Sequence, residues 1–112
     1  MMKVEEFEKE VIRILCSDVI TNSVLSDAIN HPEKIECKFT GAGYYLDIHH
    51  HELPSERIVL DTANIEGMYQ DIEVGFVVFV EDHVLCLECY NYGNNKGVPP
   101  GIRNGTVTIS QT

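Results

Sequence analysis

The feature of this sequence that most constrains its fold is a pair of apolar segments, residues 73–80 and 84–90, separated by a short polar turn. Such near-continuous hydrophobicity is typical of central strands, and a two-residue turn at Asp82 and His83 would join them as a hairpin. Alternation along both strands predicts a main core face, made of Val74, Phe76, Val78, Val80, Leu85, Leu87 and Cys89. The other face, with Val77, Phe79 and Cys86 among glutamates, is apolar enough that we expect the N-terminal helix to cover part of it.

A second hairpin is predicted for residues 35–40 and 44–49, which flank Gly41-Ala42-Gly43. An even loop of two or four residues would pair six apolar residues on one face: Phe39 with Tyr44, Cys37 with Leu46, and Ile35 with Ile48. A three-residue loop would instead pair Cys37 with Asp47. Because a slip of one residue turns every side chain to the wrong face, the pattern favours the even loop.

The remaining elements are shorter. Val4, Phe7, Val11, Ile14 and Leu15 recur at helical spacing and predict a helix over residues 3–16. A second helix is expected over residues 23–29, capped by Asn22 or Ser23 and ended at His31-Pro32. Residues 57–60 suggest a short strand. Residues 92–101 form a predicted loop, and Asn104-Gly105 suggests a turn that pairs residues 102–103 with residues 106–110. The fold class predicted is α+β: one domain, residues 1–112, with N-terminal helices packed on a twisted antiparallel sheet of about five to six strands.

The charge distribution limits the possible partners. Residues 37–90 hold ten acidic and two basic residues, a net charge of −8 of the chain's −10. A negative sheet surface repels phosphate backbones and attracts basic proteins, so we expect a basic protein partner and no nucleic acid. The charged N-terminus lacks the apolar region of a signal peptide, and the longest apolar run is too short to span a bilayer. We therefore expect a cytoplasmic protein with no membrane association and with reduced cysteines.

The sequence has only weak candidates for a catalytic or metal-binding motif. Cys86 and Cys89 lie within one strand, so their sulfur atoms should point to opposite faces and not form a metal or redox site. His49 and His51 would share a face with Asp47 and Glu36, which makes a metal site a chemically sensible alternative. No nucleophile elbow, phosphate-binding loop or dinucleotide fingerprint is present. We expect neither an enzyme nor a bound cofactor.

Residues 61–71 join two predicted strands, and they mix acidic side chains with Tyr and Met, residues that interfaces favour. The end of the last central strand, with Tyr90 and Tyr92, has a similar character. The partner-binding residues predicted from both segments are Asp61, Asn64, Glu66, Tyr69, Asp71, Glu73 and Tyr92.

About half of the chain, from Phe39 through residues 73–83 to Tyr90, resembles in general character the immunity proteins of bacterial toxin systems, with contact-dependent growth inhibition as the nearest type. The likeness lies in a helical start, a twisted antiparallel sheet, strong acidity and the lack of a catalytic motif. It implies a cytoplasmic protein that binds one cognate toxin domain, often a basic nuclease, and covers its active site. Two alternatives stay open: a small enzyme or metal-binding protein that uses His49 and His51, and an acidic adaptor subunit of another complex. A homodimer through an uncovered sheet edge also stays open.

Overall fold

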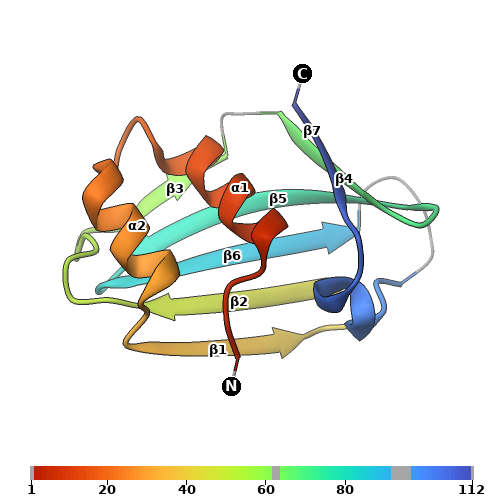
Figure 1. Ribbon diagram of the computed structural model, residues 1–112, viewed down its shortest axis with the longest axis horizontal. Helices are drawn as coiled ribbons and strands as arrows, with labels where there is room; N and C mark the ends of the chain where they lie inside the picture. Colours follow the sequence, from red (N-terminus) through yellow and green to blue (C-terminus); the bar gives the residue numbers. More distant parts are fainter. Residues whose placement is uncertain (1, 62–63, 92–96, 112) are drawn as a thin grey trace.

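The computed structural model describes residues 2–61, 64–91 and 97–111, in which two helices precede a seven-stranded antiparallel sheet (Figure 1). The prediction of an α+β fold with N-terminal helices is confirmed, with slightly more strands than expected. The helices are α1 (Glu6–Cys16) and α2 (Asn22–Asn30). The strands are β1 (Lys34–Phe39), β2 (Gly43–His49), β3 (Ile58–Leu60), β4 (Ile65–Tyr69), β5 (Ile72–Glu81), β6 (Val84–Asn91) and β7 (Thr108–Gln111). Neither helix approaches the length and apolar character that crossing a membrane would require.

Helix α1 forms because its apolar residues fall on one stripe, as the spacing predicts. Phe7, Val11 and Leu15 are buried, together with Ile12, which the predicted stripe omitted. The helix begins at Glu6, three residues later than expected, after a turn in which the Glu5 N–H donates to the Glu8 carboxylate at 2.8 Å. Helix α2 follows its N-cap residue Thr21 and ends at Asn30, before the His31-Pro32 pair that was expected to end it.

Both predicted hairpin registers are confirmed. In the β1–β2 hairpin Phe39 pairs with Tyr44 and Cys37 pairs with Leu46. In the β5–β6 hairpin Glu81 pairs with Val84, so Asp82 and His83 form a two-residue turn, with φ values of 53° and 65°. Positive φ at both central positions matches the twist of a hairpin turn. The period-2 apolar pattern therefore determined how these four strands align.

The strand order is β1-β2-β6-β5-β4-β7, and β3 also pairs with β5. Strand β5 is long enough that its outer side carries two neighbours, β3 beside residues 78–80 and β4 beside residues 72–75. The two hairpins therefore lie side by side, from β1 at one edge to β5, and the shorter strands extend the sheet beyond β5 (Figure 1).

Strand β4 lies inside residues 61–71, which were expected to be a connection without a strand. It alternates inward and outward like any strand, but its middle inward position is Gly67. A Cβ atom there would lie 2.9 Å from the nearest carbon of Val74 and 3.0 Å from that of Phe76. The core side chains of β5 occupy this space, so the strand has only two inward side chains, Ile65 and Tyr69, and little apolar signal.

The turn predicted at Asn104-Gly105 is also wrong. Residues Pro100–Asn104 form a 3-10 helix, η1, which the Gly105 N–H closes by donating to the Ile102 carbonyl at 3.2 Å. The Tyr69 ring packs on Gly105, where a Cβ atom would lie 2.2 Å from it. The chain then continues into β7, which pairs with β4 rather than with residues 102–103.

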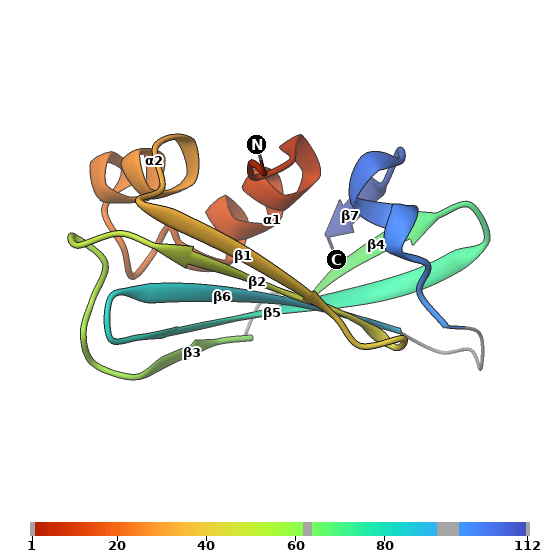
Figure 2. The ribbon, with the colours of Figure 1, turned by 90° about the horizontal axis from the view of Figure 1, so that it is seen from below.

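The two faces of the sheet differ sharply. Both helices lie over one of them, and Figure 2 shows no helix over the other among the described residues. The Phe7 ring of α1 meets Phe76 at 6.3 Å between centroids, which places the helices on the face that holds Val74, Val78 and Leu87. We call this the core face and the other the open face. The expectation that α1 covers part of the open face is wrong, because the glutamates at positions 73, 81 and 88 interrupt its apolar surface.

Candidate functional site

The open face has an apolar centre that remains accessible to solvent. Of the seven large hydrophobic side chains that are exposed among the described residues, four lie on it: Tyr45, Val59, Met68 and Tyr90. Partly buried Val77, Phe79 and Cys86 lie between them. Contiguous exposed apolar surface of this kind marks a binding surface more often than a chance exposure.

Strand pairing arranges these side chains in rows across the sheet. One row runs from Asp47 through Cys86 and Phe79 to Val59. The next row runs from Tyr45 through Glu88 to Val77. Aromatic and aliphatic side chains therefore lie beside carboxylates within single rows, a composition typical of protein interfaces.

Carboxylates surround and interrupt the apolar centre. The described strands place six acidic residues on the open face: Glu36, Asp47, Glu66, Glu73, Glu81 and Glu88. The same strands place two lysines there, Lys34 and Lys38. Lys34 contacts Glu36 at 3.6 Å and Arg57 contacts Glu81 at 3.2 Å, so the unbalanced charge lies towards Asp47, Glu66, Glu73 and Glu88.

Hydrogen bonds hold several of these side chains in place. The charge of Glu88 and a hydrogen bond to it raise the pKa of the Tyr45 hydroxyl. Burial raises the pKa of the Cys86 thiol to about 12, helped by a hydrogen bond to Asp47. The Tyr90 ring lies across Gly75, where a Cβ atom would be 2.5 Å from it. The aromatic groups of the surface are thus oriented before any partner arrives, which lowers the entropy cost of binding.

The structure brings together only part of the predicted site. Glu66 and Glu73 lie on adjacent strands of the open face, where Glu66 pairs with Gly75 and Met68 with Glu73. Tyr69 points to the core face, against Gly105. The remaining predicted residues lie outside this surface: Asp61 and Asn64 are exposed between β3 and β4, Asp71 is in the β4–β5 turn, and Tyr92 lies outside the described residues.

Sequence reasoning missed Tyr45, Asp47 and Glu88 as members of one surface. The register of the first hairpin already placed Tyr45 and Asp47 opposite its apolar face, and that of the second did the same for Glu88. What the sequence did not show is that β2 pairs with β6, which sets Tyr45 directly beside Glu88.

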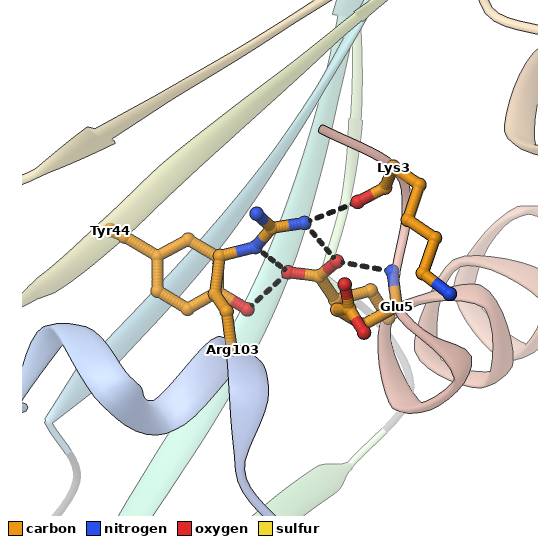
Figure 3. Close-up of polar contacts among 5 residues, drawn as sticks. Lys3, Glu5, Tyr44 and Arg103 are labelled. Atoms are coloured by element: carbon orange, nitrogen blue, oxygen red, sulfur yellow. Dashed lines mark hydrogen bonds and ion pairs between the residues drawn. The ribbon is translucent and has the colours of Figure 1, made fainter. Parts of the chain in front are cut away.

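The most buried polar group, by contrast, is closed to any ligand. The Glu8 side chain is 0% exposed, and it accepts hydrogen bonds from Arg103 Nε and Nη2, each at 2.8 Å, and from the Tyr44 hydroxyl at 2.6 Å (Figure 3). The Glu5 N–H adds a fourth bond, and Arg103 Nη2 also donates to the Lys3 carbonyl at 2.7 Å. Both carboxylate oxygens are occupied, and these bonds join α1, β2 and η1.

A groove of about 560 Å³ lies between the N-terminal segment, the end of α2 and the start of β1. Lys3, Lys9 and Lys34 line it together with apolar side chains such as Ile29. Lys9 contacts Glu6 at 3.7 Å and Lys34 contacts Glu36, so two of the three lysines are already paired with carboxylates. The groove therefore has less unpaired positive charge than its lining suggests.

The four cysteines are free thiols. Cys86 and Cys89 point to opposite faces, as the strand geometry predicts, with Cys89 buried on the core face. Burial raises the pKa values of the Cys16 and Cys89 thiols to about 12, so neither resembles an activated nucleophile.

Comparison of the chain with protein-family models, with curated proteins and with solved structures finds no match.

Proposed function

We propose that this protein binds a basic protein domain through the open face of its sheet and neutralises it, as an immunity protein neutralises its cognate toxin. The observation that carries the proposal is the combination on one accessible face of a preoriented aromatic centre and an excess of carboxylates. Tyr45, Tyr90 and Phe79 would supply desolvated contact area, and Glu66, Glu73 and Glu88 would attract lysine and arginine side chains.

Two features support an inhibitor over a simple adaptor. Carboxylates spaced along neighbouring strands can occupy the positions that nucleic-acid phosphates take in a basic groove, so binding would exclude a nuclease's substrate. The surface is also rigid, because its side chains lie on the paired strands β2, β6, β5 and β4. A rigid, charged surface favours fast association with one complementary partner. The resemblance to contact-dependent growth inhibition immunity proteins makes a bacterial toxin domain, in the cytoplasm, the expected partner.

The test is a pull-down from the source organism at low and high salt, with three forms of the protein as bait. The first is the wild type. The second carries Glu66→Gln and Glu73→Gln on the open face. The third carries Glu10→Gln and Asp18→Asn, two exposed acids in and just after α1, and so has the same net charge as the second.

The proposal predicts one basic protein that the wild type and the helix variant retain at low salt and that the open-face variant retains less. That protein should arrest growth when it is expressed alone and lose this effect when the bait is co-expressed. Equal loss in both variants would mean that net charge, not the open face, governs binding. A captured partner without toxicity would favour the adaptor function.

The same variants refine the earlier site prediction. Replacing Asp61, Glu66, Asp71 and Glu73 together with amides should slow association and reduce its dependence on salt. We expect most of that effect from Glu66 and Glu73, because they share the open face, whereas Asp61 and Asp71 lie beyond it. A homodimer stays a prediction: β1 is the last strand on one side of the described sheet, and analytical ultracentrifugation of the free protein tests it.

A further inference from the structure

All five histidines of the chain gather at one end of the sheet. His31 follows α2, His49 ends β2, His50 and His51 come next, and His83 lies in the β5–β6 turn, which faces the end of β2 (Figure 1). Neither the open face nor the buried Glu8 cluster accounts for this concentration.

Two of these histidines meet carboxylates from other elements. The ligand atoms of Glu33, His50 and His51 lie within 4.8 Å of one another. Those of Asp27, His50 and Glu52 also lie within 4.8 Å of one another, so His50 belongs to both groups. The described residues thus bring two imidazoles and three carboxylates together from α2, from the α2–β1 connection and from the loop after β2.

We propose that Glu33, His50 and His51 bind a divalent transition-metal ion such as Zn²⁺. Imidazole nitrogen and carboxylate oxygen are the ligands that zinc takes in proteins alongside thiolate. Three carboxylates near two imidazoles also give the site a negative potential that favours a divalent cation. This inference does not depend on the function proposed for the open face.

Backbone hydrogen bonds hold the ligand-bearing segments in register before any ion binds. The Glu33 N–H donates to the His49 carbonyl at 2.9 Å, and the His51 N–H donates to Glu33 Oε2 at 3.1 Å. The His50 N–H donates to the His83 carbonyl at 3.1 Å, and the Leu53 N–H closes the loop on the His50 carbonyl at 3.1 Å. Because these segments are already ordered, metal binding would require rearrangement of side chains only.

The contact that an ion would replace between Glu33 and His51 is a weak one, because His51 Nδ1 contacts Glu33 Oε2 in an exposed pair. Exposed ion pairs contribute little to stability, so exchanging them costs little. The His50 and His51 rings already stack at 4.8 Å between centroids.

His49 provides an internal control. The sequence suggested His49 and His51 as the ligand pair, with Asp47 and Glu36, but strand alternation turns His49 to the open face. There its Nε2 lies 3.3 Å from Glu36 Oε1. Neither His49 nor Asp47 belongs to the two metal-competent groups found among the described residues.

The test is a Zn²⁺ titration of the untagged full chain, after chelator treatment, in competition with a chromophoric zinc indicator. We expect one ion per chain in the wild type. Glu33→Gln and His51→Ala should each weaken zinc binding about tenfold or more, and His49→Ala should leave it within about twofold. The two ligand positions tested are exposed, so circular dichroism should show native folding of both variants; His50, which is 5% exposed, is left unchanged for this reason.

Absence of stoichiometric binding by the wild type would overturn the proposal. So would equal losses in His49→Ala and His51→Ala, because they would place the ion on the open face or on several surface histidines at once. Thermal unfolding is an independent readout: zinc should raise the Tm of the wild type and of His49→Ala, but not that of Glu33→Gln.

Discussion

The two faces of strand β5 show how differently one apolar segment can be used. On the core face, Val74, Phe76, Val78 and Val80 are at most 4% exposed beneath α1. On the open face, Val77 and Phe79 lie between Glu73 and Glu81 along the strand and remain partly exposed. The fold therefore needs only half of this hydrophobicity. The other half stays partly exposed in the free protein, which is why we propose that it contacts a partner.

Charge differs between the faces in the same way. The core side holds a single carboxylate–guanidinium pair among its described residues, Glu8 with Arg103, in which every oxygen of the carboxylate has donors. Six carboxylates lie on the open face of the described strands, and four of them, Asp47, Glu66, Glu73 and Glu88, form no ion pair with another described residue. Polar groups inside must be satisfied by the fold itself, whereas those outside can be satisfied by water or by another protein.

The two faces should differ most in how the free energy of unfolding responds when one negative charge is removed from each. Glu8→Gln leaves the Arg103 guanidinium, which is 8% exposed, without its counter-ion, and should lower the free energy of unfolding by about 3–5 kcal/mol. Glu73→Gln on the exposed open face should change it by less than about 0.5 kcal/mol. Urea denaturation followed by circular dichroism measures both.

A double variant separates charge from packing at the buried site. If the loss in Glu8→Gln comes from the unpaired guanidinium, combining Glu8→Leu with Arg103→Met should recover most of the stability. A double variant as unstable as the single one would show instead that the hydrogen bonds to Tyr44 and Lys3 matter more than the charge pair.

The second contrast uses two adjacent residues of the same type. Val78 is 0% exposed on the core face, and its replacement by alanine should cost about 2 kcal/mol from lost burial and a residual cavity. Val77, partly exposed on the open face, should cost less than about 1 kcal/mol. Affinity for the partner should fall more in Val77→Ala than in Val78→Ala. A Val78→Ala variant that binds the partner more weakly than Val77→Ala would contradict the assignment of the faces.

The sequence predicted the two central hairpins because their period-2 patterns are long and a slip would have been costly. Cys37 aligns with Leu46, and Glu81 with Val84, as expected. It failed at β4, where Gly67 replaces an inward side chain, and at β7, a short and mostly polar strand with one apolar residue, Ile109. A local sequence pattern gives little information about a strand that forms because it pairs with a segment distant in the sequence.

The candidate site was predicted less well for a related reason. Glu66 and Glu73 of the predicted site lie on the open face, but Tyr69 turns to the core face because β4 is a strand rather than a loop. For the histidines, strand alternation was extended past the end of β2, which would place His49 and His51 on one face. The strand ends at His49, and the loop after it sets His50 beside His51.

The smallest expected contrast is between the alkylation rates of the two cysteines of β6, which lie on opposite faces of the sheet. Burial raises the pKa values of both the Cys86 and Cys89 thiols to about 12. Neither thiol is therefore activated at pH 8, and both react slowly, faster as the pH rises. Access to the reagent then decides which of the two reacts first. Iodoacetamide labelling with peptide mass spectrometry should modify Cys86 in the native protein and Cys89 only when the protein unfolds.

A bound partner should slow the alkylation of Cys86 and leave that of Cys89 unaffected, because only Cys86 lies on the open face. Equal native rates for the two thiols would show that this face is no more accessible than the core.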